Sequence, residues 1–242
     1  MSVPTILALD TATEVCSVAV LGASHCIERR ETVGNGQSER ILPMVDEVMN
    51  ESGMALAEVD FIAFGAGPGS FTGLRIACGI AQGLAWSAGK RVVPVGNLRA
   101  LAARAFAVQT AGDVALVAID ARMQESYCAV YRRELRNGQV DAVEARAPSL
   151  ERPASLPGLA SEFDVALVTG NALSVFSSVW PTAHSWVALP ELRATAADIA
   201  RLARGDALLG RTVAPHEALP VYIRDQVALT TDERRQRRGV VA

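Results

Sequence analysis

The sequence predicts a mixed α/β protein built from two related halves with a cleft between them. The first observation is a buried apolar run at 6–10 that ends in an aspartate and is followed, after a short turn, by a second run at 17–21. This spacing is typical of a β-hairpin. The second observation is a repeat. Asp120 lies 110 positions after the aspartate of the first run, and the apolar runs before it and at 128–130 match the first hairpin without a gap.

A further correspondence supports the duplication. The runs 61–65 and 165–170 are apolar strands that each lead into glycine and then into a stretch with helical periodicity. Each half therefore combines a hairpin with β-to-α crossovers, and two α/β halves flanking a cleft are the simplest architecture with these parts. Chance similarity of two β-rich segments is the alternative explanation of the repeat.

Helical periodicity occupies four of the segments between the strands. The predicted helices are 39–50, 72–87, 98–108 and 196–203. The spacing Thr195-x-x-Asp198 is that of a capping box and predicts the start of the last helix. Pro43 either opens the first helix or kinks it. Three glycines are expected to end helices: Gly53, Gly89 and Gly205.

Composition bounds the class of protein. Apolar residues make up 50% of the 242 residues, and the 23 basic and 26 acidic side chains give a net charge of −3, which excludes a strongly cationic nucleic-acid-binding body. No run approaches the roughly 20 apolar residues of a bilayer span, and the first residues lack the features of a leader, so we expect a cytoplasmic protein without a membrane role. The cysteines and histidines are scattered along the sequence, so we expect reduced thiols in the core and no metal site.

The chain is expected to divide into three segments. These are an N-terminal α/β lobe over 1–108, a second α/β lobe over 109–228, and a flexible tail over 229–242. The tail carries four clustered arginines, at 234, 235, 237 and 238. Contact with tRNA is one interpretation of this cluster, and a solvated chain end is the simpler one.

A glycine-rich segment at 65–75 connects a predicted strand to a predicted helix. Such loops can hold phosphate on exposed N–H groups. The segment fails three specific motif tests. It lacks the lysine that follows the last glycine of a Walker loop, and Thr72 stands where a dinucleotide fingerprint has its third glycine. Ser70 also lacks the flanking glycines of a nucleophile elbow. Two interpretations stay open: tight turns with close helix packing, or contact with a ligand or partner.

The two helices on either side of this strand carry unusual faces. The first has an apolar stripe, and the second has small residues every four positions, with a neighbouring row formed by Gly79 and Gly83. Small residues at this spacing allow another backbone to approach closely. The pattern fits helices that cover their own sheet, and it fits equally well helices that dock on another protein.

Asp10 and Asp120 each end a repeated strand, so pseudo-symmetry would place them on one cleft, where an acidic pair can hold a magnesium nucleotide. The turns after them lack the glycine that lets backbone N–H groups approach phosphate. Arg122 could neutralise either carboxylate. The sequence therefore favours a degenerate nucleotide cleft over a working one, with Asp10, Thr11, Asp120 and Arg122 as its candidate residues.

Five segments carry a family resemblance: 6–13, 40–45, 67–76, 118–123 and 220–224, within a match from about 6 to 228. They resemble the bacterial TsaB family of tRNA threonylcarbamoyladenosine biosynthesis proteins. The run from Gly67 to Gly73 is highly specific to that family, whereas the strand-plus-aspartate motifs are shared by the actin, Hsp70 and sugar-kinase superfamily. The resemblance implies two ribonuclease-H-like lobes of that actin-like ATPase superfamily.

The resemblance also implies a function. It implies a non-catalytic subunit that binds and activates TsaD, a related protein that carries the metal and transfers a threonylcarbamoyl group to adenosine 37 of tRNAs reading codons that begin with A. An ATPase, TsaE, completes the assembly, and tRNA is met through the complex. The chain is expected to have no cofactor and no protease or ATPase activity of its own, and ATP at an interface with partners is left open. The alternative is an ATP-dependent small-molecule kinase of the same superfamily, for which Asp10 and Asp120 would be needed.

The family's partner surface lies on its first two helices. Carried over by position, the interface with TsaD, or with a second copy in its absence, comprises Ile41, Leu42, Val45, Leu74, Ala77, Ile80 and Ala81. The chain departs from the family at Gln37, where members often carry histidine. A contact through that imidazole is therefore in doubt for this chain.

Overall fold

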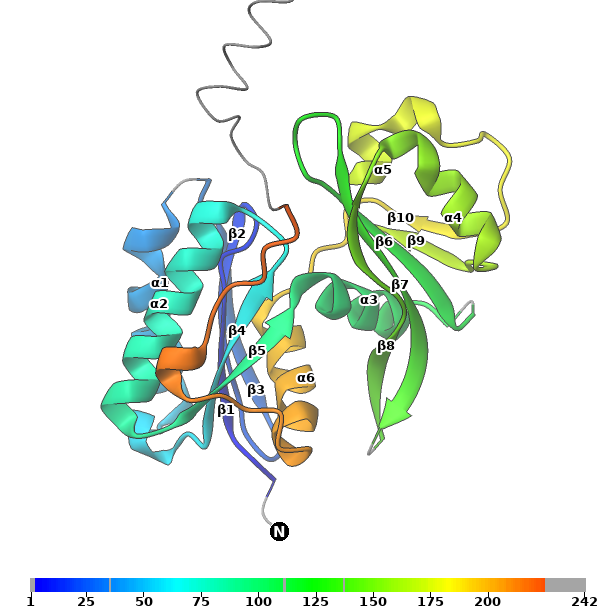
Figure 1. Cartoon of the computed structure of the whole chain (residues 1–242). Coiled ribbons are helices and arrows are strands. Elements are labelled where there is room, and N and C mark those ends of the chain that lie inside the picture. Colours follow the sequence, from blue (N-terminus) through cyan, green and yellow to red (C-terminus); the bar gives the residue numbers. More distant parts are fainter. Residues whose placement is uncertain (1–2, 35, 111, 137, 225–242) are drawn as a thin grey trace, which may run out of the picture.

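The computed structural model describes residues 3–34, 36–110, 112–136 and 138–224. Its strands form two five-stranded mixed sheets, ordered β3-β2-β1-β4-β5 and β8-β7-β6-β9-β10 (Figure 1). In each sheet the first strand in the chain pairs antiparallel with the second, and the second pairs antiparallel with the third. The fourth strand pairs parallel with the first, and the fifth pairs parallel with the fourth. This shared connectivity confirms the mixed α/β class and the predicted duplication.

The elements have the following bounds. The strands are β1 Ile6–Asp10, β2 Val15–Leu21, β3 Cys26–Thr32, β4 Phe61–Gly67, β5 Arg91–Gly96, β6 Val114–Asp120, β7 Ser126–Arg136, β8 Gln139–Glu151, β9 Leu167–Thr169 and β10 Val187–Leu189. The α-helices are α1 Gln37–Ser52, α2 Phe71–Ala88, α3 Asn97–Val108, α4 Leu156–Glu162, α5 Ala172–Val175 and α6 Ala196–Leu208.

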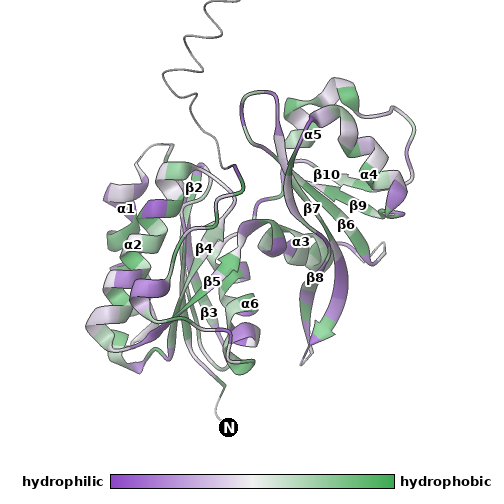
Figure 2. Cartoon of the chain, in the orientation of Figure 1, coloured by the Kyte–Doolittle hydropathy of each residue, from purple (hydrophilic) through white to green (hydrophobic). Residues whose placement is uncertain are grey.

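Alternation along the strands sorts the apolar side chains into layers. In β1, Ile6 and Ala8 enter a central cluster that lies between the two sheets, whereas Leu7 and Leu9 enter an outer cluster. Helices α1 and α2 complete the outer cluster of the first sheet, and α4 and α5 complete that of the second. Figure 2 shows the central strands β6 and β9 in green, while the edge strand β8 carries purple bands.

Helices α3 and α6 fill the space between the sheets and are exchanged between the lobes. Helix α3 follows the first sheet in the chain but packs on β6, β7 and β8 of the second. Helix α6 follows the second sheet but packs on β1, β2, β4 and β5 of the first (Figure 1). The two lobes are therefore interlocked by the central cluster, and the division at residue 108 stays a prediction.

The helix boundaries mostly follow the predicted signals. Gly53 and Gly89 end α1 and α2 in left-handed conformation, and the side chain of Asp198 accepts from the N–H of Thr195 at 3.0 Å in the expected capping box. The prediction for Gly205 is wrong, because α6 continues through it to Leu208. The next residue, Asp206, is buried and ion-paired, which keeps this turn helical. Pro43 lies inside α1 and does not open it.

Several predictions concern classes of site. The cysteines Cys16, Cys78 and Cys128 are buried and Cys26 is half-buried, all with free thiols. Within the described ranges, no three His, Cys, Asp or Glu side chains lie together as a metal site would require. No described helix combines the length and hydropathy that a membrane span needs. The predicted tail at 229–242 lies outside the described residues.

Candidate functional site

Asp10 ends β1 and points into the protein. It is 1% exposed, and its Oδ1 accepts hydrogen bonds from the Ala12 N–H at 3.1 Å and from Asn97 Nδ2 at 3.0 Å. Burial outweighs these bonds and raises the pKa of Asp10 to about 6. Asn97 also accepts from the N–H of Gly67 at 2.7 Å, so it joins β1 to the glycine-rich loop. Sequence reasoning missed Asn97, although a polar residue directly after β5 was a signal.

The glycine-rich loop packs on the turn that follows Asp10. The Ser70 N–H donates to the Ala12 carbonyl at 2.8 Å, and the Thr11 hydroxyl donates to the Gly73 carbonyl at 2.6 Å. A Cβ at Gly69 would lie 2.7 Å from the Ala12 oxygen, and one at Gly73 would collide with the Thr11 oxygen. The glycines are therefore required by close backbone packing, which was the first of the two open interpretations.

Asp120 ends β6 and is held by its own turn. Its Oδ1 accepts from the Arg122 N–H at 2.8 Å, and its Oδ2 lies 3.2 Å from Arg122 Nη1. Of the two carboxylates that Arg122 could neutralise, it forms an ion pair with Asp120, through a side chain that is 88% exposed. In the described part of the chain no hydrogen bond or ion pair joins Asp10 to Asp120. Each carboxylate of the predicted pair has its own partners.

The segment 213–224 runs along the first lobe and reaches the second. Val213 pairs with Val92 at the β5 edge, and the Val221 N–H donates to the Ala66 carbonyl at 2.7 Å. Arg224 then donates to the carbonyl of Ala121 at 3.0 Å and to other acceptors in the turn between β6 and β7. The segment therefore fastens the glycine-rich loop of one lobe to the Asp120 turn of the other. We call it the clasp.

The clasp holds a turn with unfavourable backbone geometry. Arg122, Met123 and Gln124 have φ angles of 63°, 55° and 60°, in the left-handed region that side chains other than glycine seldom adopt. Three such residues in succession persist where the surroundings fix them. Arg224 supplies that constraint, because it also bonds Glu125 Oε2 at 2.7 Å and is only 12% exposed.

Replacing Arg224 with alanine is expected to lower the free energy of unfolding by about 2 kcal/mol, the contribution of charge-assisted hydrogen bonds to a partly buried group. Hydrogen exchange at 121–125 should rise, because that turn loses its anchor. Arg122→Ala is the matched control, since this exposed side chain should cost less than about 1 kcal/mol. If the exchange rates at 121–125 in Arg224→Ala match those of the wild type, the clasp does not hold this turn.

The predicted interface residues occupy two environments. Five of the seven are between 0% and 5% exposed: Ile41, Val45, Leu74, Ala77 and Ala81. All of these except Leu74 belong to the outer cluster of the first lobe. Leu42 is 48% exposed and Ile80 is half-buried. Helical periodicity identified the stripe, but the stripe faces the chain's own sheet, so these five side chains have no direct access to a partner in this conformation. Docking on these helices stays a prediction.

The opposite face of α2 is open. Gly79 and Gly83 are exposed, and nothing lies within 4 Å of a Cβ built on either. Figure 1 shows α1 and α2 on the side of the first sheet away from the second lobe. Gln37, which stands where relatives of the resembled family often carry histidine, is buried and donates to the carbonyls of Gly34 at 2.6 Å and Thr13 at 3.1 Å. It fixes the start of α1 on the β1–β2 turn.

Comparisons with known proteins agree with this geometry. A family model described as TsaD, tRNA N6-adenosine threonylcarbamoyltransferase, matches residues 31–200. The tRNA threonylcarbamoyladenosine biosynthesis protein TsaB of Haemophilus influenzae is 38% identical, covering 92% of this chain and 94% of that protein; the Escherichia coli protein of the same name is 36% identical, covering 92% and 96%. The solved structure of YeaZ from Pseudomonas aeruginosa has a TM-score of 0.79 at 38% identity, covering 92% of this chain and all of that one. The chain belongs to the TsaB family of tRNA threonylcarbamoyladenosine biosynthesis proteins.

Proposed function

We propose that the chain is a non-catalytic subunit that binds and activates a TsaD-type transferase for threonylcarbamoylation of adenosine 37 in tRNAs reading codons that begin with A. The observation that carries the proposal is the open row of Gly79 and Gly83 on α2. An interior helix glycine costs about 1 kcal/mol relative to alanine. No neighbour within the described chain requires these two to be small, so close approach of a partner's helix is the use that they support.

The same face serves two partners in this proposal. TsaD covers it in the active complex, and a second copy of the chain covers it when TsaD is absent, through a two-fold contact of identical surfaces. The TsaE ATPase and the tRNA join through the complex. The chain supplies no cofactor or catalytic group of its own, in keeping with the internal partners of Asp10 and Asp120, and any ATP would lie at an interface with these partners.

Gly79→Glu is expected to abolish association while leaving the monomer folded. The site is open, so the side chain fits, and glutamate favours helix more than glycine does. A carboxylate buried without a partner costs several kcal/mol, which corresponds to at least about a hundredfold weaker binding. The measurements are light-scattering mass, alone and with TsaD, and the yield of threonylcarbamoylated tRNA. The buried Ala77 and Ala81 are poorer test sites, because a bulky residue there would disrupt the core.

Gly158→Glu is the matched control, since Gly158 is also an exposed helical glycine with open space, but on α4 of the second lobe. It should keep wild-type assembly and modification. Undiminished complex formation and tRNA modification by Gly79→Glu would overturn the proposal. Reduced modification in both variants would also count against it, because the effect would then not belong to the α2 face.

A further inference from the structure

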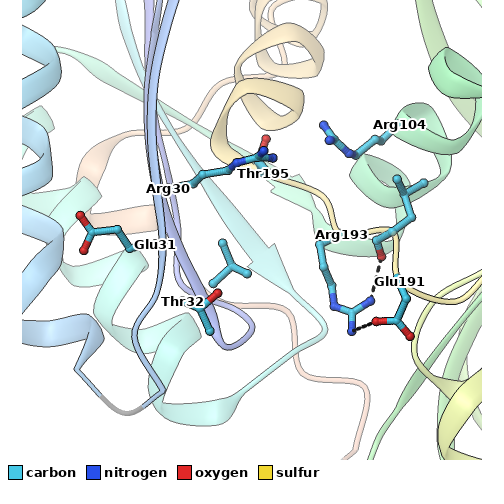
Figure 3. Close-up of a pocket in the computed structure, with 9 residues that line it drawn as sticks. Arg30, Glu31, Thr32, Arg104, Glu191, Arg193 and Thr195 are labelled. Atoms are coloured by element: carbon cyan, nitrogen blue, oxygen red, sulfur yellow. Dashed lines mark hydrogen bonds and ion pairs between the residues drawn. The ribbon is translucent and has the colours of Figure 1, made fainter.

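A pocket of about 330 Å³ lies where the two lobes meet (Figure 3). One wall comes from β2 and β3 of the first sheet, another from α3, and the third from the connection between β10 and α6. The lining residues are Val15, Arg30, Glu31, Thr32, Arg104, Glu191, Leu192, Arg193 and Thr195. None of the four residues predicted for the nucleotide cleft is among them.

Three arginines enter this pocket from three different elements. Figure 3 shows Arg30 and Arg104 pointing toward one another across it, beside Thr195. Arg30 is exposed and forms no ion pair among the described residues. Arg104 lies 3.1 Å from Asp198 through Nη1, but its buried Nε has no hydrogen-bond partner. A buried guanidinium nitrogen without an acceptor costs free energy that an incoming oxyanion would recover.

The third arginine is fixed in place. Arg193 donates through Nη1 to the carbonyls of Pro190 at 2.9 Å and Leu192 at 3.1 Å, and its Nε lies 3.0 Å from Glu14. These bonds orient the guanidinium before any ligand arrives. A preoriented group loses less conformational entropy on binding than a free one.

The two acidic lining residues leave the space positive. Both oxygens of Glu31 are taken by Arg40 on α1, at 2.8 Å and 2.5 Å, and Figure 3 shows this carboxylate pointing away from the arginines. Glu191 is 81% exposed and lies 3.9 Å from Arg193, at the rim. Asp198 offsets Arg104 in part, but it also pairs with Arg201 at 3.2 Å.

We propose that this pocket binds a small phosphate-bearing ligand, such as inorganic phosphate or a phosphate monoester. Guanidinium groups match phosphate oxygens in charge and hydrogen-bond geometry. Three of them line this pocket, and those of Arg30 and Arg104 point toward one another across it. The volume is at the lower end of ligand sites, which fits a small molecule. Because both lobes and the exchanged helix α3 line the pocket, the bound anion stabilises one relative arrangement of the lobes.

Isothermal titration with inorganic phosphate, at ionic strength held constant with NaCl, tests the proposal on the full chain. The wild type should bind one phosphate saturably, with a dissociation constant of about 1 mM or below. Arg30→Gln should bind about tenfold more weakly, the effect of losing one charge-assisted hydrogen bond. In the absence of phosphate, the variant should have the same unfolding temperature as the wild type, because Arg30 has no partner to lose among the described residues.

Arg152→Gln is the matched control, because Arg152 is also exposed but lies on the second lobe outside the pocket. It should bind phosphate as the wild type does. Titrations that fail to saturate, or Arg30→Gln binding no more weakly than Arg152→Gln, would overturn the assignment. A wild-type heat signal reproduced by NaCl alone would do the same, because the effect would then be general screening.

Discussion

Replacing Arg99 with alanine is expected to lower the free energy of unfolding by about 3–5 kcal/mol, the cost of removing one partner from a buried ion pair. Arg99 on α3 bonds Asp141 of β8 at 2.8 Å and Asp206 of α6 at 2.5 Å. The two carboxylates are 10% and 5% exposed. Without Arg99 both would remain buried, with only Arg136 at 3.5 Å and Arg211 at 3.1 Å beside them.

The effect is large because the network joins the exchanged helices to the second sheet. Urea unfolding measures it, and Arg29→Ala is the control, since the Arg29–Glu51 pair is more than 40% exposed on both sides and should contribute less than about 1 kcal/mol. A change below about 1 kcal/mol in Arg99→Ala would show that the neighbouring arginines are enough to hold the carboxylates. In that case the network would not fix how the lobes meet.

Local patterns were enough to predict the architecture. The apolar strand runs and the 110-residue repeat indicated two related α/β halves, and the structure has two sheets of the same connectivity. Left-handed glycines and the capping box act within one turn of helix, so they can be recognised from a few residues, as at Gly53 and Thr195. The prediction at Gly205 is wrong because a tertiary contact, the burial of Asp206, overrides the local tendency of glycine to end a helix.

Contacts between distant segments could not be predicted in the same way. Periodicity gives the stripe of Ala77 and Ala81 but not the direction in which it faces, and the structure turns it inward and leaves Gly79 outward. The exchange of α3 and α6 depends on which sheet offers an apolar face. Asn97 and Arg224 act on residues far away in sequence, so neither had a local signature beyond its place after a strand or in a family segment.

Replacing Asp10 with asparagine is expected to stabilise the protein above pH 6. Burial raises the pKa of this carboxyl to about 6 from an unfolded value near 3.9. The folded chain therefore binds the proton at Asp10 more tightly than the unfolded chain, so the contribution of Asp10 to stability is fully present below pH 4 and is lost as the pH rises to about 6. The full loss is about 3 kcal/mol, because each pKa unit corresponds to 1.36 kcal/mol. Asparagine carries no charge to bury, and its Oδ1 can accept the same two hydrogen bonds.

Urea unfolding of both proteins between pH 4 and pH 8 measures the difference. The two curves should agree near pH 4 and separate by up to about 3 kcal/mol above pH 6, whereas Asp46→Asn, at an exposed position of α1, should follow the wild type throughout. Parallel curves for Asp10→Asn would show that the carboxylate is not desolvated.

The same variant separates the two functional hypotheses, because a kinase that uses Asp10 to hold a magnesium nucleotide would lose ATP turnover with this change. A subunit that acts through the exposed face of α2 would gain stability and keep its activation of TsaD, because Asp10 is buried inside the first lobe and is not part of that face.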